Sequence, residues 1–352
     1  MIRVGLVGFG MAGRVFHAPL LASVDGLELA AVVERSTNNA AERYPGITTY
    51  RLIEALLADT TLGLIVLATP SGAHFEQAKQ ILEAGKNLVV DKPMAATSAE
   101  IAQLIEIARA RGVLLAPFHN RRWDSDFRTI QKLLPEGSLG RLVSFESNYD
   151  RWRPVPKAGA WREDPAQAGG TVLDLGTHLG DQVLALFGKP EGVSAEVKRE
   201  RDGVGANDSF QIRLRYVGFT VNLGANCFSA QPRSRFHLRG TKGNFVKLGL
   251  DIQEAALQKI AHITDPAWGQ EPSANWGTLH VDVDGGMVVR PVAPIPGDYR
   301  LYYAGIRDAL LGKAAAQVTA LDAWRVAKVL EWAVESSEQR REIACEWSGE
   351  PK

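Results

Sequence analysis

The chain has 352 residues, and its 40 Lys and Arg balance its 40 Asp and Glu, so the formal net charge is zero. A neutral balance gives no reason to expect a nucleic-acid or anionic-membrane partner. Two cysteines in this length make neither a disulfide framework nor a zinc site, so we expect no metal and a cytoplasmic protein with reduced thiols. No apolar run is long enough for a transmembrane helix, and the length predicts about two domains.

The first third of the sequence alternates short apolar runs with helical patterns. The apolar runs predict strands at residues 2–7, 27–33, 62–68, 88–90 and 113–118. The helical patterns lie at residues 10–22, 52–58, 74–84 and 98–111. Strands without polar alternation are buried on both faces, as in a parallel sheet covered by helices. We therefore predict a doubly wound, dinucleotide-binding α/β domain over residues 1–118.

The pattern changes after residue 118. Helices are expected at residues 124–134, 169–187, 299–311 and 320–336. Strands are expected at residues 142–149, 193–201, 210–216, 219–228 and 235–238. Consecutive strands joined by glycine-containing turns favour an antiparallel sheet. Residues 119–352 are thus predicted to form an α+β substrate-binding domain with one large, open, mainly antiparallel sheet, and the short linker favours a cleft between the two domains.

A glycine motif follows the first predicted strand and opens the first predicted helix. In this βαβ context a G-x-G-x-x-G motif predicts a dinucleotide site, because glycines allow the tight turn and let backbone N–H groups approach a pyrophosphate. The alternative is a plain glycine-rich turn. The six residues are Gly8, Phe9, Gly10, Met11, Ala12 and Gly13.

An acidic residue, Glu34, ends the second predicted strand, about 20 residues beyond the glycine motif. A carboxylate there accepts hydrogen bonds from the adenosine ribose and repels a 2′-phosphate, so Glu34 slightly favours NAD. The neighbouring Arg35, assisted by Ser36, is able to hold a 2′-phosphate, although Arg35 is equally well explained as a solvated surface side chain. The expected cofactor is NAD or NADP.

A lysine follows the strand predicted at residues 88–90, within Asp91-Lys92-Pro93. The carboxyl edge of a doubly wound sheet is the ligand crevice, where a lysine donates to a substrate oxygen or acts as a base. Pro93 biases Lys92 toward an extended backbone or a cis bond. The alternative is a surface lysine in a turn.

Asp174 and His178 are four residues apart in the helix predicted at 169–187, so they share a face. A carboxylate beside an imidazole fixes its tautomer and raises its basicity, as a general base requires. The same spacing suits a metal, but no third ligand of convincing spacing follows. The alternative is an ion pair on the helix surface.

Arginine and aromatic residues are interleaved at residues 119–124 and 148–153, and again at Trp161-Arg162. Such clusters bind single-stranded nucleic acid or a sugar, and the zero net charge favours the sugar. Arginines stacked at a domain or subunit interface explain part of the pattern in either case.

Taken together, these motifs resemble the Gfo/Idh/MocA family of NAD(P)-dependent oxidoreductases over almost the whole chain. The resemblance rests on residues 8–13, on Thr-Pro-Ser-Gly-Ala-His at 69–74, on Gly85-Lys86 before residues 91–93, and on the Asp174 to His178 pair. Asp91 stands where the family usually has Glu. The sequence is most similar to the scyllo-inositol dehydrogenase branch, at residues 13–21, 119–127, 149–154 and 240–254.

The resemblance implies roles for the matching residues. Lys92 would hydrogen-bond the reacting hydroxyl, His178 would be the general base or acid, and Asp174 would position His178 or bind substrate. Trp161 and Arg162 would lie near the cofactor. Further cofactor contacts are expected from Thr69, Pro70, Ser71, His74, Asp91, Lys92 and Asn120. Further substrate contacts are expected from Asn120, Tyr149 and Arg151.

The expected function is hydride transfer between a nicotinamide cofactor and a secondary hydroxyl or ketone of a cyclic polyol or sugar, an inositol above all. A histidine suits the proton transfer, and a lysine suits the charge that develops on oxygen. The alternatives are a reductase of an oxo-sugar such as 1,5-anhydrofructose, or a non-catalytic NAD(P)-binding regulator, which would not need Lys92, Asp174 and His178. The family also implies a homodimer or homotetramer that uses the open sheet of residues 119–352.

Overall fold

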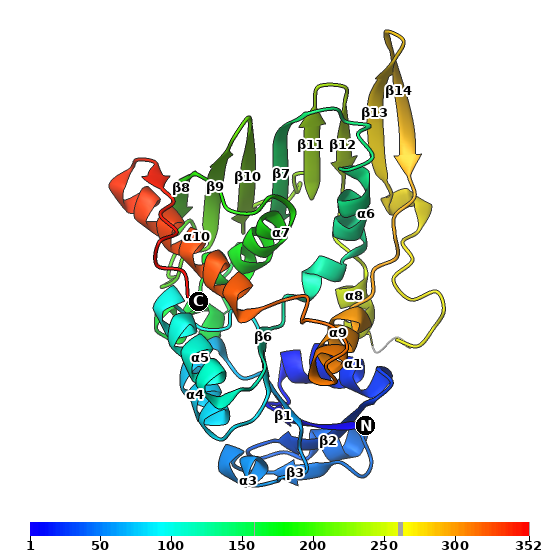
Figure 1. The fold of residues 1–352 in the computed structure, drawn as a ribbon. Helices are drawn as coiled ribbons and strands as arrows, with labels where there is room; N and C mark the ends of the chain where they lie inside the picture. The colour runs from blue at the N-terminus through cyan, green and yellow to red at the C-terminus, as the bar shows by residue number, and fades with distance from the viewer. Residues whose placement is uncertain (158, 260–262, 352) are drawn as a thin grey trace.

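Two sheets of different kinds lie at opposite ends of the molecule (Figure 1). The computed structural model describes residues 1–157, 159–259 and 263–351. The first sheet has six strands, in the order β3-β2-β1-β4-β5-β6, and every pair is parallel. Its strands are β1 (Ile2–Val7), β2 (Leu27–Val33), β3 (Thr48–Tyr50), β4 (Leu64–Leu67), β5 (Leu88–Val90) and β6 (Leu115–Pro117). This is the predicted doubly wound domain.

Short helices connect these strands. The chain forms α1 (Ala18–Ser23), α2 (Asn39–Arg43), α3 (Ile53–Leu57), α4 (His74–Glu83) and α5 (Ser98–Arg111). The bounds of α5 match the prediction because its end signals are local: a capping box joins Thr97 and Glu100, and Gly112 adopts a φ of +65° at the other end. The strand order reverses between β1 and β4, which puts the ligand crevice at the carboxyl ends of these strands.

The second sheet has nine strands, in the order β14-β13-β12-β11-β7-β10-β9-β8-β15. Only β7 and β10 pair in parallel, so the predicted mainly antiparallel sheet is confirmed. The sequence analysis did not predict the strands β12, β13, β14 and β15; in β14 no residue is buried, so that strand lacks an apolar pattern. The strands are β7 (Leu142–Asp150), β8 (Gly192–Lys198), β9 (Ser209–Tyr216), β10 (Phe219–Asn226), β11 (Phe236–Gly240), β12 (Gly243–Lys247), β13 (Gly277–Val283), β14 (Gly286–Val292) and β15 (Ile343–Ala344).

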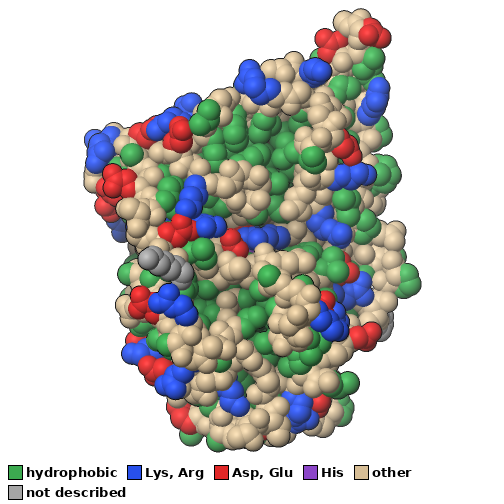
Figure 2. Space-filling view, in the orientation of Figure 1, with side chains coloured by type: hydrophobic (Ala, Val, Ile, Leu, Met, Phe, Trp, Pro, Cys, Tyr) green, Lys and Arg blue, Asp and Glu red, His purple; other side chains and the backbone are tan. Residues whose placement is uncertain are grey.

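Helices cover one face of this sheet, and the figures show that face (Figures 1 and 2). They are α6 (Ser125–Leu133), α7 (Thr177–Phe187) and α10 (Ala320–Gln339), which share one apolar cluster with the strands. On β9 the side chains of Gln211, Arg213 and Arg215 point to the opposite face and are exposed. That a partner subunit covers this polar face stays a prediction.

Each sheet has its own apolar clusters, but helices from the end of the chain contribute to those of the first sheet. Tyr302 and Tyr303 of α9 (Arg300–Leu310) are buried in the apolar cluster that contains Val4 and Leu6 of β1. Trp324 of α10 is buried in the cluster that contains β4 and β5 residues. The predicted boundary at residue 118 therefore divides the sheets, but helices from the end of the chain complete the first domain.

Two of the predicted helices contain a π-helical segment. The helix expected at 10–22 has π geometry over η1 (Gly13–His17), and the helix expected at 169–187 has π geometry over η6 (Val172–Gly176). Hydrophobic period does not reveal one extra residue in a turn, and such turns are frequent at functional sites. The remaining helical segments are η2 (Ser71–Ala73), η3 (Asn120–Trp123), η4 (Trp161–Glu163), η5 (Pro165–Gln167), η7 (Ser273–Asn275) and α8 (Gln253–Gln258). None of the helices in the described ranges is both long and apolar enough to cross a membrane.

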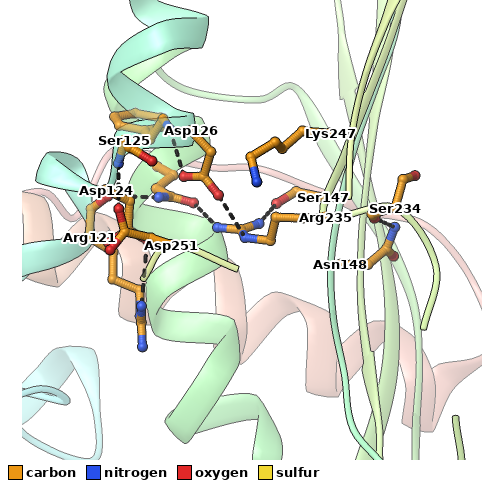
Figure 3. Close-up of polar contacts among 12 residues, drawn as sticks. Arg121, Asp124, Ser125, Asp126, Ser147, Asn148, Ser234, Arg235, Lys247 and Asp251 are labelled. Atoms are coloured by element: carbon orange, nitrogen blue, oxygen red, sulfur yellow. Dashed lines mark hydrogen bonds and ion pairs between the residues drawn. The ribbon is translucent and has the colours of Figure 1, made fainter. Parts of the chain in front are cut away.

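A buried polar layer lies between α6 and the large sheet (Figure 3). Arg235 is almost fully buried, and its guanidinium donates to Ser147 Oγ and, at 2.7 Å, to Gln182 Oε1. Asp251 accepts hydrogen bonds of 2.7 Å from the backbone N–H groups of Ser125 and Gln253. This layer forms the floor beneath the cleft between the two domains. Because it contains charged groups, we expect the stability of the folded protein to depend on pH.

We expect Asp251→Asn to flatten the pH dependence of stability between about pH 4 and pH 6. Burial raises the pKa of Asp251 to about 6 in the folded protein, above the value of about 3.9 in an unfolded chain. Folded protein therefore binds the proton more tightly, and its stability falls as pH rises through this window, by about 3 kcal/mol for this group. Thermal unfolding midpoints at several pH values measure the effect, with the exposed Asp202→Asn as control. Parallel curves for parent and Asp251→Asn would contradict it.

Candidate active site

A continuous trough crosses the carboxyl edge of the first sheet and enters the space between the domains. A cavity of about 720 Å³ lies at the ends of β1, β2 and β4, and a cleft of about 220 Å³ lies between the domains. A smaller cavity shares Gly10 and Thr69 with the first and Lys92 and Arg162 with the second. A long ligand and a small one can therefore meet end to end.

Most of the predicted site residues line this trough. The large cavity is lined by Gly8, Phe9, Gly10, Glu34, Arg35, Ser36, Thr69 and Pro70. The connecting cavity adds Ser71 and Trp161. The cleft is lined by Met11, Ala12, Asp91, Lys92, Asn120, Arg151, Arg162, Asp174 and His178. Gly13, His74 and Tyr149 are the predicted site residues that line none of these three cavities.

The glycine loop between β1 and η1 fits a dinucleotide. Gly8 has a φ of +98°, which side chains rarely adopt, and a Cβ at Gly13 would lie 2.1 Å from the Gly8 oxygen. A Cβ at Gly10 would meet no atom within 4 Å, so Gly10 faces open space at the edge of the cavity. The loop thus leaves a cradle beside a helix start, which is what a pyrophosphate needs. Gly13 serves close packing rather than ligand contact.

Glu34 lines the cavity, but its carboxylate serves its own loop. One oxygen accepts from Thr37 Oγ1 at 2.6 Å and the other from the Ala40 backbone N–H at 2.8 Å. The residue is only 5% exposed. The expectation that this carboxylate is turned toward a ribose is therefore not supported, because the loop of residues 35–40 folds back over it. Arg35 and Ser36 are exposed at the same end of the cavity.

His74 does not line the trough, contrary to the prediction. It is 1% exposed, and its Nδ1 lies 2.7 Å from the Pro93 oxygen while its Nε2 lies 2.9 Å from the Thr69 oxygen. The ring turns inward because two backbone carbonyls face its two nitrogens. His74 thus links the loop after β4 to the cis Lys92–Pro93 peptide after β5.

Tyr149 is also buried rather than exposed to substrate. Its ring is 1% exposed and lies between two guanidinium groups, with Arg121 Cζ 5.2 Å and Arg235 Cζ 4.6 Å from the ring centroid. Through Arg235 the Tyr149 ring contacts the buried polar layer. It supports the floor of the cleft.

Lys92 and Asp174 form the central contact of the cleft. Lys92 Nζ donates to Asp174 Oδ1 at 2.6 Å and to the Asp174 backbone oxygen at 2.7 Å. Arg151 and Arg162 approach the same carboxylate at 3.6 and 3.7 Å. Burial alone would raise the pKa of Asp174, but Lys92 and the two arginines hold it well below its usual range. Asp174 is therefore ionised.

The predicted pairing of Asp174 with His178 is wrong. The π-helical η6 carries Asp174 toward Lys92, and among the described residues its polar contacts go to Lys92, Arg151 and Arg162. His178 is buried, and its Nδ1 has no hydrogen-bond partner within the described part of the chain. Burial, followed by the charge of Lys92, lowers the pKa of His178 well below its usual value. His178 is therefore a neutral imidazole at neutral pH.

The arginine clusters divide between structure and site. Arg122 donates to both oxygens of Asp181 at 2.9 and 2.7 Å, which ties η3 to α7. Arg121 forms an ion pair with Glu254 at the cleft. Arg122 therefore has a structural role within the second domain, whereas Arg151 and Arg162 line the cleft.

The sequence analysis missed several residues of the trough. Thr37, Arg51 and Gln167 line the large cavity, and Arg121, Arg153, Glu254 and Gln258 line the cleft. Arg121 and Arg153 belong to the arginine clusters, so a signal existed for them. Nothing near Glu254 or Gln258 in the sequence indicates a site. In the ranges that the structure covers, no group of three His, Cys, Asp or Glu could hold a metal ion.

A dinucleotide cradle that opens into a cleft with a fixed lysine and a neutral histidine defines an NAD(P)-dependent oxidoreductase. Comparison with known families agrees. Residues 2–119 match the oxidoreductase family's NAD-binding Rossmann fold, and residues 131–345 match its C-terminal alpha/beta domain. The chain belongs to the Gfo/Idh/MocA oxidoreductase family.

Individual relatives cover almost the full length. The chain is 35% identical to the scyllo-inositol 2-dehydrogenase (NADP(+)) IolW of Bacillus subtilis, over 98% of this chain and 96% of that one. It is 38% identical to the oxidoreductase YdgJ of Escherichia coli, over 96% and 97%. A solved structure of the oxidoreductase yvaA from Bacillus subtilis superposes with a TM-score of 0.95 at 35% identity, over 98% of both chains.

We expect Gly10→Ala and Gly13→Ala to separate cofactor binding from folding. Gly10→Ala should keep the melting temperature of the parent and weaken NAD(P)H binding at least about tenfold, because its methyl group enters open space that the pyrophosphate needs. Gly13→Ala should lower the melting temperature, because its Cβ would clash with the Gly8 oxygen. Fluorescence titration with NAD(P)H and thermal unfolding measure the two effects. Unchanged affinity in Gly10→Ala would exclude the pyrophosphate from this cradle.

Proposed function

We propose that the chain is an NADP(H)-dependent dehydrogenase that interconverts a secondary hydroxyl and a ketone on a cyclic polyol or sugar, with inositols as the first candidates. The observation that carries this proposal is the presence of Lys92, Asp174 and His178 at the inner end of the trough. The relative named for scyllo-inositol supports a ring-shaped polyol. The cleft's many charged hydrogen-bonding groups suit a ligand rich in hydroxyls.

Lys92 is arranged to hold the reacting oxygen. An ammonium has three N–H donors, and two of those on Lys92 are used by Asp174. Among the described residues the third has no partner, so it can donate to the substrate oxygen, which becomes negatively charged as its proton leaves during oxidation or as hydride arrives during reduction. Because Asp174 fixes the ammonium, this donor is oriented before the substrate arrives.

His178 is suited to receive the hydroxyl proton. A neutral imidazole accepts a proton during oxidation and returns it during reduction. The nicotinamide ring of the bound cofactor supplies the hydride acceptor. Burial, followed by the charge of Lys92, lowers the pKa of His178, so the imidazole is neutral before the reaction and able to accept the proton.

Lys92, Asp174 and His178 equally suit a reductase of an oxo-sugar such as 1,5-anhydrofructose. That enzyme would catalyse the reverse reaction, from ketone to hydroxyl, on a different ring. Comparison with mouse trans-1,2-dihydrobenzene-1,2-diol dehydrogenase, 29% identical over 69% of this chain, indicates that relatives act on other cyclic diols. A non-catalytic regulator is disfavoured, because it needs neither a fixed lysine nor a neutral histidine in the cleft.

NADP is favoured over NAD by the loop after β2. The carboxylate of Glu34 is engaged by Thr37 and Ala40, whereas Arg35 and Ser36 are exposed at the adenosine end of the cavity. A guanidinium there provides two parallel donors for a 2′-phosphate. The NADP(+) dependence in the name of the Bacillus relative agrees. This reverses the slight preference for NAD drawn from the sequence.

We expect the parent to prefer NADP and Arg35→Ala to lose that preference. The value of kcat/KM for NADP should fall at least about tenfold, because a charge-assisted contact to the phosphate is removed, while that for NAD stays within about twofold. Steady-state kinetics with both cofactors measures this, with Arg43→Ala on α2 as the matched control outside the cavity. A parent that prefers NAD would contradict the proposal and restore the role first expected for Glu34.

We expect His178→Ala and Lys92→Ala each to lower kcat by about 10²–10⁴-fold with cofactor binding retained. The fold should survive in Lys92→Ala, because Arg151 and Arg162 still neutralise Asp174. Their combined effect should be less than additive if the two groups act as one unit. A spectrophotometric panel of inositols, aldoses and oxo-sugars provides the substrate, and His280→Ala on β13 is the control outside the cleft. Near-normal turnover in His178→Ala would exclude it as the proton acceptor.

The pH profile gives an independent check on His178. Because burial and nearby cations lower its pKa, the imidazole stays neutral as pH falls through 6.5. The acid limb of kcat for oxidation should therefore lie well below pH 6.5. An acid limb at 6.5 or above would contradict the environment described for this histidine.

A further inference from the structure

The far wall of the cleft comes from α8, a helix that the proposed chemistry does not use. Glu254 and Gln258 are one turn apart on α8, and both line the cleft. Leu257, between them in sequence, is buried in the apolar cluster that contains Val15 of η1. Although α8 follows the strands of the second domain in the sequence, this contact anchors it beside the glycine loop, so the wall is rigid.

Glu254 is held from two sides. Its Oε2 pairs with Arg121, and its Oε1 accepts from Gln258 Nε2 at 3.2 Å. Burial would raise the pKa of Glu254, but Arg121, Arg151 and Lys92 lower it, so the carboxylate is ionised. Lys92 and Glu254 line the same cleft, from different domains of the chain.

The carboxylate keeps capacity for a ligand. Each oxygen has two acceptor sites, and the contacts with Arg121 and Gln258 use one on each oxygen. The side chain is 32% exposed, on the side that faces the cleft. A carboxylate only accepts hydrogen bonds, so its complement is a pair of O–H donors at the spacing of its two oxygens, as neighbouring hydroxyls of a ring provide.

We propose that Glu254, oriented by Arg121 and Gln258, determines substrate specificity by accepting hydrogen bonds from two neighbouring hydroxyls on the side of the ring away from Lys92 and His178. The inference rests on the proposed function and narrows it. The substrate is a cyclic polyol with a vicinal diol remote from the reacting carbon, and a ring that lacks this diol is a poor substrate even when it carries the reacting hydroxyl.

The test pairs enzyme variants with deoxy substrates. For the parent, kcat/KM is measured with the best inositol and with deoxyinositols that each lack one hydroxyl. Loss of a contacted hydroxyl should lower kcat/KM about 10–100-fold, mainly through KM, because it removes hydrogen bonds to a charged group. Glu254→Gln should show a similar loss with the complete inositol and less than about threefold further loss with that deoxyinositol. Glu342→Gln, which removes an Arg–Glu pair outside the cleft, should behave as the parent.

Each possible result either supports or overturns the proposal about Glu254. If Glu254→Gln discriminates among the deoxyinositols as the parent does, or lowers kcat with unchanged KM, the proposal is overturned while the proposed function stands. If the parent oxidises no polyol or sugar, the proposed function fails and the inference fails with it.

If thermal unfolding shows that Glu254→Gln does not fold, Gln258→Met replaces it. Gln258→Met should raise KM for the complete inositol. It should also reduce the difference in kcat/KM between the complete inositol and the deoxyinositol that lacks the contacted hydroxyl. An unchanged KM would overturn the proposal.

Discussion

Lys92 and Asp174 come from different domains, and the geometry of the cleft depends on their ion pair. Burying two charges is costly unless each is well paired, and here the ammonium has two acceptors on one residue and the carboxylate is surrounded by three cations. The pair therefore fixes the end of β5 against η6. It also affects His178, because burial and then the charge of Lys92 disfavour a charged imidazole there.

The rest of the fold holds Lys92 and Asp174 in position relative to each other. The cis Lys92–Pro93 peptide is linked through His74 to the loop after β4, so the lysine and the cofactor loop are positioned together. On the other side, Arg235 and its neighbours form a polar floor under the helix that carries Asp174 and His178 (Figure 3). Helices α9 and α10 pack into the first domain and hold the two halves together. The walls of the cleft thus come from seven separate segments of the described chain.

Several site residues could be predicted because their signals are local. The glycine loop, Lys92 after β5 and the helix carrying His178 follow from strand ends, spacing and residue type within a few turns of chain. Predictions failed where a side chain had a choice of partners. Glu34 turned to its own loop, His74 to two carbonyls, Tyr149 to two arginines, and Asp174 to Lys92 instead of His178. Tyr149 and Asp174 found their partners in segments distant in sequence, whereas Glu34 turned to partners three and six residues away.

By itself the sequence determined the two-domain α/β and α+β architecture, the dinucleotide motif and the residue types available for hydride chemistry. These follow from hydrophobic period and from the turns that glycine allows, which are properties of short segments. Only the tertiary structure decided that α8 lines the same cleft as Lys92, that Asp174 of η6 pairs with Lys92 across the domain boundary, and that the last helices complete the first core. The physical reason is that contacts between distant segments are selected by the burial and charge pairing of the whole fold, which no local pattern contains.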